Sequence, residues 1–180
     1  MLKPTNSKMI KNQQEAYQLL EQLGAEKRLI THVKLVGEAI EVLLKAVEQL
    51  GVEMDSNLVR LGTALHDAGK IRYPNELNEP GLQHEPAGEQ LLIENGVQKE
   101  IARFCLSHAR WQQIPCSLEE LLVALADQLW KGSRVEELEL KVIDEITKRL
   151  GQDRWKLFLS LDDCFESIAS KGTERLINSQ

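Results

Sequence analysis

The chain of 180 residues has few cysteines, few histidines and no long apolar run. Its three cysteines are widely spaced and form no CxxC pattern, so a disulfide framework, a cysteine zinc site and a nucleophilic cysteine are all disfavoured. The apolar run at residues 121–126 is far shorter than the ~20 residues that span a bilayer. The first ten residues lack the apolar stretch of a signal peptide. We therefore expect a cytoplasmic protein with reduced thiols and no membrane partner.

Positive charge is also scarce. The 22 Lys and Arg residues against 28 Asp and Glu residues leave a net charge of −6. An extended nucleic-acid surface is therefore not expected, although a small basic pocket remains compatible with this balance. The apolar content of 42% and the charged content of 28% are ordinary for a globular protein. A chain of this length buries about 70% of its unfolded surface, so a core needs neither disulfides nor metal.

Helical periodicity runs through almost the whole chain, and no segment alternates at period two. We expect an all-α fold in which residues 1–180 form a single domain of seven or eight helices. Ser7 is the expected cap of the first helix, and Pro86 is the expected first residue of the fourth. The expected helices cover residues 7–23, 27–50, 55–69, 86–96, 98–110, 117–131, 135–150 and 153–170.

Several polar residues occur where apolar core residues are expected. His32, His108 and Asp127 lie on or beside the inward stripes of their helices. A buried carboxylate without a partner costs several kcal/mol, so it should be paired, protonated or bound to metal. A single inward histidine is usually a hydrogen-bonded core residue, and an aspartate late in an apolar helix usually caps or pairs. The joint arrangement of these residues favours a site.

The adjacent pair His66-Asp67 requires a local explanation. Neighbours on a regular helix diverge by about 100°, so they converge on one centre only where the helix ends or a metal bridges them. Gly69 provides such an ending two residues later. A short aspartate at that position can bind one ion with each of its two oxygens.

The order of these residues resembles the HD superfamily of metal-dependent phosphohydrolases. The strings TALHDAGKI, QHEPAGEQLL and ALADQLWKGSR carry the resemblance, which covers about residues 27–134 and leaves residues 7–23 and 135–170 as helical extensions. The resemblance implies an all-α fold with a central metal site. It implies that the first ion is held by His32, His66, Asp67 and Asp127. The two-metal branch adds His84 and His108, with Asp67 bridging the two ions.

The resemblance also implies the chemistry. Imidazole and carboxylate ligands suit iron, manganese, zinc, cobalt or nickel, so ligand type does not select the metal. Two ions about 3.5–4 Å apart polarise a phosphoryl group and share a hydroxide that acts as the nucleophile. We expect a nucleotide or another small phosphoester to be hydrolysed, as a phosphomonoester, a phosphodiester or a dinucleotide. The segment around His84 looks somewhat like the branch that cleaves diadenosine tetraphosphate symmetrically.

Basic residues follow the expected ligands. The HDxGK pattern places Lys70 in contact with phosphate and, with Asp67, in the catalytic machinery; Arg134 is the next candidate for binding substrate. Lys131 and Arg134 share a helical face with Asp127 if that helix continues. Arg110 follows His108 by two residues. A solvated surface charge is the alternative interpretation for Lys131 and Arg110.

Two other functions fit the same residues. Some HD-fold proteins are mixed-valent di-iron oxygenases that use the same six ligands. Others are non-catalytic regulatory modules, although the intact ligand set argues against that role here. Trp111 and Trp130 either stack on a base or belong to the core or a subunit interface. The first helix and the last two either shape the pocket or form a homodimer interface.

Overall fold

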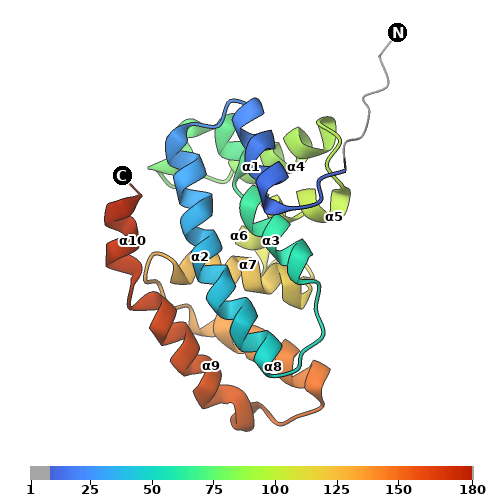
Figure 1. Ribbon diagram of the computed structural model, residues 1–180, viewed down its shortest axis with the longest axis vertical. Helices are drawn as coiled ribbons and strands as arrows, with labels where there is room; N and C mark the ends of the chain where they lie inside the picture. The colour runs from blue at the N-terminus through green and yellow to red at the C-terminus, as the bar shows by residue number, and fades with distance from the viewer. Residues whose placement is uncertain (1–8, 180) are drawn as a thin grey trace.

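A computed structural model describes residues 9–179, which fold into helices joined by short turns, with no strand among them (Figure 1). The all-α prediction is confirmed. The α-helices are α1 (Gln13–Gln22), α2 (Lys27–Gln49), α3 (Ser56–Leu65), α4 (His84–Glu94), α5 (Lys99–Ala102), α6 (Phe104–Arg110), α7 (Leu118–Leu129), α8 (Glu136–Leu150), α9 (Arg154–Ala169) and α10 (Gly172–Asn178). Two short 3-10 helices, η1 (Ala68–Ile71) and η2 (Pro74–Leu77), occupy the segment between α3 and α4.

Some helix boundaries differ from the prediction. The expected cap Ser7 lies outside the described residues, and α1 begins at Gln13, where the Asn12 side chain accepts a hydrogen bond from the backbone N–H of Glu15. Helix α4 begins at His84, two residues before Pro86. The segment expected as one helix at 98–110 is divided into α5 and α6, and α10 follows α9 as an additional helix.

Helix α7 is the centre of the bundle, and α2, α3, α6 and α8 pack around it. Its residues 121–126 are all buried, so the apolar run of the sequence is the middle of a buried helix. The predicted capping box is present: Ser117 accepts from the backbone N–H of Glu120, and the Glu120 carboxylate accepts from the backbone N–H of Ser117. No helix within residues 9–179 has the length and apolarity that a membrane crossing requires.

The long helix α2 joins two apolar clusters. Its first turns, including Leu29 and Val33, pack with α1, α3 and α5. Its later turns, including Ile40 and Val47, pack with α7, α8 and α9. His32 lies on α2 where one cluster gives way to the other. The boundary between the two clusters is therefore where the polar side chains of interest meet.

Candidate metal centre

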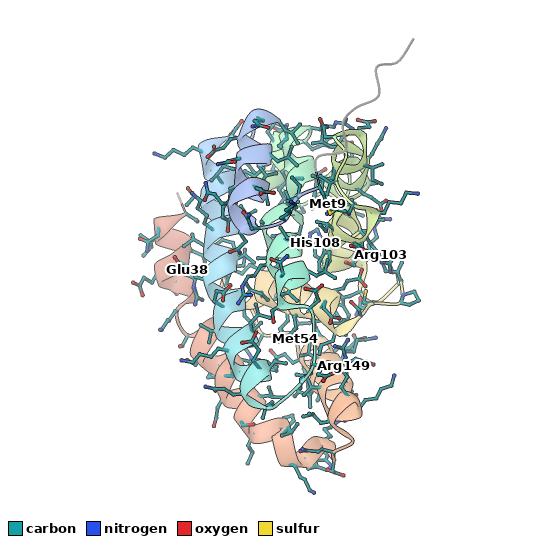
Figure 2. All side chains as sticks on the ribbon, turned by 45° about the vertical axis from the view of Figure 1, so that its right-hand side comes forward. Met9, Glu38, Met54, Arg103, His108 and Arg149 are labelled. Atoms are coloured by element: carbon teal, nitrogen blue, oxygen red, sulfur yellow. The ribbon has the colours of Figure 1, made fainter. Side chains whose placement is uncertain are left out.

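Five elements bring six polar side chains together. His32 comes from α2, His66 and Asp67 from the end of α3, His84 from the start of α4, His108 from α6 and Asp127 from α7. Figure 2 shows His108 inside the bundle, whereas Glu38 lies at its surface. The side chains form two groups that share Asp67, and within each group the potential ligand atoms lie within 4.8 Å of one another. The first group is His32, His66, Asp67 and Asp127, and the second is Asp67, His84 and His108.

The two oxygens of Asp67 face different groups. Oδ2 lies 2.8 Å from His32 Nε2 and 3.5 Å from His66 Nε2. Oδ1 lies 3.4 Å from His84 Nε2 and 3.6 Å from His108 Nε2. The grouping is the one that the family resemblance implies, and Asp67 has the orientation that a bridging ligand needs. Ligation itself remains a prediction.

The end of α3 explains how His66 and Asp67 can converge. Helix α3 ends at Leu65, His66 still has helical dihedral angles, and Asp67 departs from them with φ −103° and ψ 15°. The helix therefore ends four residues earlier than predicted, and η1 begins immediately at Ala68. This break in the helix removes the 100° divergence between neighbouring side chains that a continuous helix would impose.

A close backbone contact positions His84. A Cβ atom on Gly69 would lie 1.7 Å from the His84 carbonyl oxygen and 2.7 Å from the Gly88 nitrogen. A Cβ atom on Gly88 would lie 2.8 Å from the Gly69 nitrogen and 2.9 Å from Cys105 Sγ. No side chain fits at either position. The two glycines thus allow η1 and α4 to pack closely enough for His84 to reach Asp67.

Hydrogen bonds fix the histidine rings. Nδ1 of His66 lies 2.8 Å from the Thr63 carbonyl oxygen, and Nδ1 of His108 lies 3.0 Å from the Phe104 carbonyl oxygen. Nδ1 of His84 lies 2.6 Å from Glu76 Oε2. Because a carbonyl oxygen can only accept, Nδ1 carries a proton in both His66 and His108, so the neutral form of either ring has its lone pair on Nε2. Such outer hydrogen bonds orient histidine ligands in metal sites.

The inner atoms of the cluster lack ordinary hydrogen-bond partners. Among the described residues, buried atoms without such a partner include Nε2 of His32, His66 and His84, together with Asp67 Oδ1. Buried polar atoms are rarely left unsatisfied, and these four, which belong to the two groups that share Asp67, are arranged as metal ligands would be. The imidazole and carboxylate donors therefore fit divalent transition metals.

The electrostatics of the cluster suit cation binding. Burial alone would raise the pKa of Asp67, but His66 and Lys70 lower it well below its usual range. Burial would likewise raise the pKa of Asp127, but the neighbouring His66 lowers it below its usual range. Burial and the charge of His66 lower the pKa of His108 to about 4. The carboxylates are thus ionised and His108 is neutral near pH 7, as metal ligation requires.

A cavity of about 250 Å³ opens beside the first group, and His32 and Asp127 line it. The predicted substrate-binding residues Lys70 and Lys131 also line this cavity, as does Trp130, whose ring centroid lies 4.7 Å from that of His32. Lys70 Nζ lies 2.7 Å from Asp67 Oδ2. These residues therefore join the metal ligands to a possible substrate-binding space.

The other predicted substrate-binding residues lie elsewhere. Helix α7 ends at Leu129, so Arg134 does not continue the face of Asp127. Arg134 instead pairs with Glu139, Asp162 and Glu166 at a separate hollow. Arg110 pairs with the buried carboxylate of Glu85 and thereby ties α6 to α4.

The sequence reasoning missed two residues at this site. Glu76 orients His84 from within the irregular segment, where no periodicity marks it. Arg28 lines the cavity from one turn before His32 on α2. The four-residue spacing to His32 is a signal that could have identified Arg28, because residues four apart share a helical face. Trp111 lies at a different hollow, near Lys141.

Comparison with known proteins identifies the family of the chain. The chain is 30% identical over 155 residues to an uncharacterised protein of Methanocaldococcus jannaschii, a match that covers 78% of this chain and 87% of that protein. It is 28% identical over 177 residues to the tRNA (cytidine(56)-2'-O)-methyltransferase of Thermoplasma volcanium; this covers 90% of the chain but 46% of that enzyme, so the chain spans less than half of its length. No solved structure gives a significant match. The family model of the HD domain matches residues 29–130, more than half of the chain, and the chain therefore belongs to the HD domain family.

Proposed function

We propose that the protein is a metal-dependent phosphohydrolase that acts on a nucleotide or another small phosphoester. The observation that carries the proposal is the position of the cationic cavity, which shares His32 and Asp127 with the first ligand group. An anionic substrate in this cavity would lie directly beside the cluster. When bound, two divalent ions such as iron, manganese, zinc, cobalt or nickel would supply an activated water and neutralise phosphoryl charge.

The side chains of the cluster divide the remaining tasks. Asp67 offers one oxygen to each ligand group and so sets the spacing between them. Lys70, in contact with Asp67 and exposed to the cavity, is placed to bind a phosphate oxygen as charge develops there. The neutral state of His108 avoids a positive charge where a cation would bind.

The activity named for the methyltransferase relative is not assigned to this chain. The methyltransferase match spans 46% of that enzyme, so methyl transfer by this chain is not supported. An oxygenase could use the same ligands, but Lys70 and Lys131 in the cavity favour a phosphorylated substrate over a neutral one. The three free cysteines, one of them buried, support a cytoplasmic location.

The test is phosphate release from a panel of nucleotides and phosphoesters in the presence of manganese, beside an oxygen-uptake assay. We expect phosphate release without oxygen consumption. Asp67→Ala should abolish turnover while the circular dichroism spectrum stays helical. Asp163→Ala, which removes an exposed aspartate on α9, is the matched control. Oxygen uptake without phosphate release, or full activity in Asp67→Ala, would refute the proposal.

A further inference from the structure

Helix α10 lies at one side of the cavity and packs against the turn after α7. A Cβ atom on Gly172, the first residue of α10, would lie 2.3 Å from the Gly132 nitrogen, so the helix start packs directly on the turn after α7. The buried Arg175 side chain donates to the Trp130 carbonyl oxygen at 3.4 Å and to the Ile168 carbonyl oxygen at 2.7 Å. These contacts hold α10, which follows α9 at the C-terminal end of the described chain, against the turn after α7 (Figure 1).

The fastened helix completes one wall of the cavity. Leu176 and Ser179 line it from the α10 side, and Leu77 of η2 also lines it. Leu176 precedes Ile177, which does not line the cavity and is 67% exposed. The family model matches residues 29–130. Helix α10 lies after this range, so this wall belongs to the C-terminal extension.

Among the described residues, two of the three lysines and arginines that line the cavity are not paired with an acid; the third, Lys70, pairs with Asp67. Elsewhere, arginines such as Arg60, Arg72 and Arg149 pair with carboxylates. Among the described residues, Arg28 and Lys131 have no carboxylate within salt-bridge distance, and Arg28 donates to the Asn78 side chain instead. Although the chain is acidic overall, Arg28 and Lys131 thus remain unpaired in one cavity, next to the His and Asp side chains of the first ligand group.

We propose that this cavity binds the phosphate of a small phosphomonoester, with Arg28 and Lys131 as binding residues and α10 as the wall that limits substrate size. The substrate class rests on the proposed function, because it assumes that the ligand cluster acts on the bound phosphate. The binding of phosphate by Arg28 and Lys131 does not depend on hydrolysis and can be measured separately.

Charge and size both favour a monoester. A phosphomonoester is close to a dianion at neutral pH. Apart from Lys70, which pairs with Asp67, the cavity offers Arg28 and Lys131, and two such cations match a dianion better than the single charge of a diester. Its volume of about 250 Å³ is below the roughly 300–1,000 Å³ of pockets for drug-sized ligands, which favours a small substrate.

The first experiment measures the binding of inorganic phosphate to the full chain by calorimetry, with and without manganese. Arg28→Gln and Lys131→Gln should each weaken binding about tenfold, because each removes a charge-assisted hydrogen bond. Arg72→Gln, which removes a nearby cation outside the cavity, should bind as the parent does. Equal phosphate affinity in all four proteins would overturn the assignment of the two residues.

The second experiment compares turnover of a 5′-mononucleotide, bis(p-nitrophenyl) phosphate and a dinucleoside tetraphosphate. We expect the mononucleotide to be preferred, and Arg28→Gln to raise its KM about tenfold. A preference for the diester or the dinucleotide would overturn the substrate class and leave the proposed hydrolase in place. If none is hydrolysed while phosphate binding still depends on Arg28, the proposed function fails and the phosphate pocket stands.

The third experiment tests the wall. Leu176→Ala should open the cavity and raise the relative turnover of nucleotides that carry a bulky group on the base, compared with the unmodified nucleotide. Ile177→Ala, the neighbouring substitution on the same helix, should leave this ratio at the parent value, because Ile177 points away from the cavity. The same ratio in both variants and the parent would overturn the role of α10 as a size-limiting wall.

Discussion

Glu76 should control the occupancy of the second ligand group. Its Oε2 accepts from His84 Nδ1 at 2.6 Å and from the His84 backbone N–H at 3.1 Å, while Oε1 accepts from the Gln83 backbone N–H at 3.2 Å. Glu76→Gln keeps the size of this side chain and replaces a charged acceptor with a neutral one. It also turns an amide donor toward one of these N–H groups, so one hydrogen bond is lost.

The magnitude follows from the hydrogen bond to the ring. A hydrogen bond to a charged group contributes about 1.5–3 kcal/mol and a neutral one about 0.5–1.5 kcal/mol, so the change costs about 1–2 kcal/mol. At 1.4 kcal/mol per factor of ten, the second ion should bind roughly 5- to 30-fold more weakly. Outer hydrogen-bond partners of metal-binding histidines typically have effects of about 10–100-fold, which overlaps the range expected here.

The assay is calorimetric titration of metal-free protein with Mn²⁺, together with elemental analysis after dialysis. The parent should bind two ions, and Glu76→Gln should retain the first and lose most of the second. Glu79→Gln removes the same charge from an exposed position in the same segment and should bind both ions as the parent does. An unchanged second affinity, or an equal loss of both ions, would refute the reasoning, because only the second group contains His84.

Two further predictions concern stability. Arg134→Gln should lower the free energy of unfolding by about 1–3 kcal/mol, since it breaks a bidentate contact with the mostly buried Glu139 and contacts with two exposed acids. Urea unfolding measures this loss, and a raised KM with unchanged stability would instead assign Arg134 to the substrate. Burial would raise the pKa of Glu119, but Arg149 and a backbone N–H lower it below its ordinary value. The contact between Glu119 and Arg149 therefore stabilises the fold above about pH 4.5. This contribution is lost as the pH falls through the lowered pKa. Glu119→Gln should therefore be about 1 kcal/mol less stable than the parent at pH 7, with a difference that shrinks in acid; a constant difference between pH 7 and pH 3 would contradict this assignment.

The helices and the inward-facing His32, His108 and Asp127 were predictable from local signals, whereas His84 was expected only from the family resemblance. Apolar residues repeat at helical spacing, and a polar residue on an apolar stripe such as His32 or His108 is visible without knowledge of the fold. Residues in irregular segments, such as Glu76, have no periodic pattern that predicts their direction. The position of Arg134 could not be predicted because it depends on where α7 ends and on acids from α8 and α9. Long-range partners of this kind are set by packing and not by local sequence.

The contact between Gly69 and Gly88 gives a practical criterion for reading other chains with the same order of histidines. Neither glycine offers a ligand atom, yet a methyl group at Gly69 would overlap the backbone of His84. A chain that keeps His84 but carries a larger residue at either glycine position would have to move the start of α4 away from Asp67. Such a chain should lose the second group, Asp67, His84 and His108, and keep the first. The residues at the positions of Gly69 and Gly88 therefore help to indicate whether a sequence of this type can form the second group.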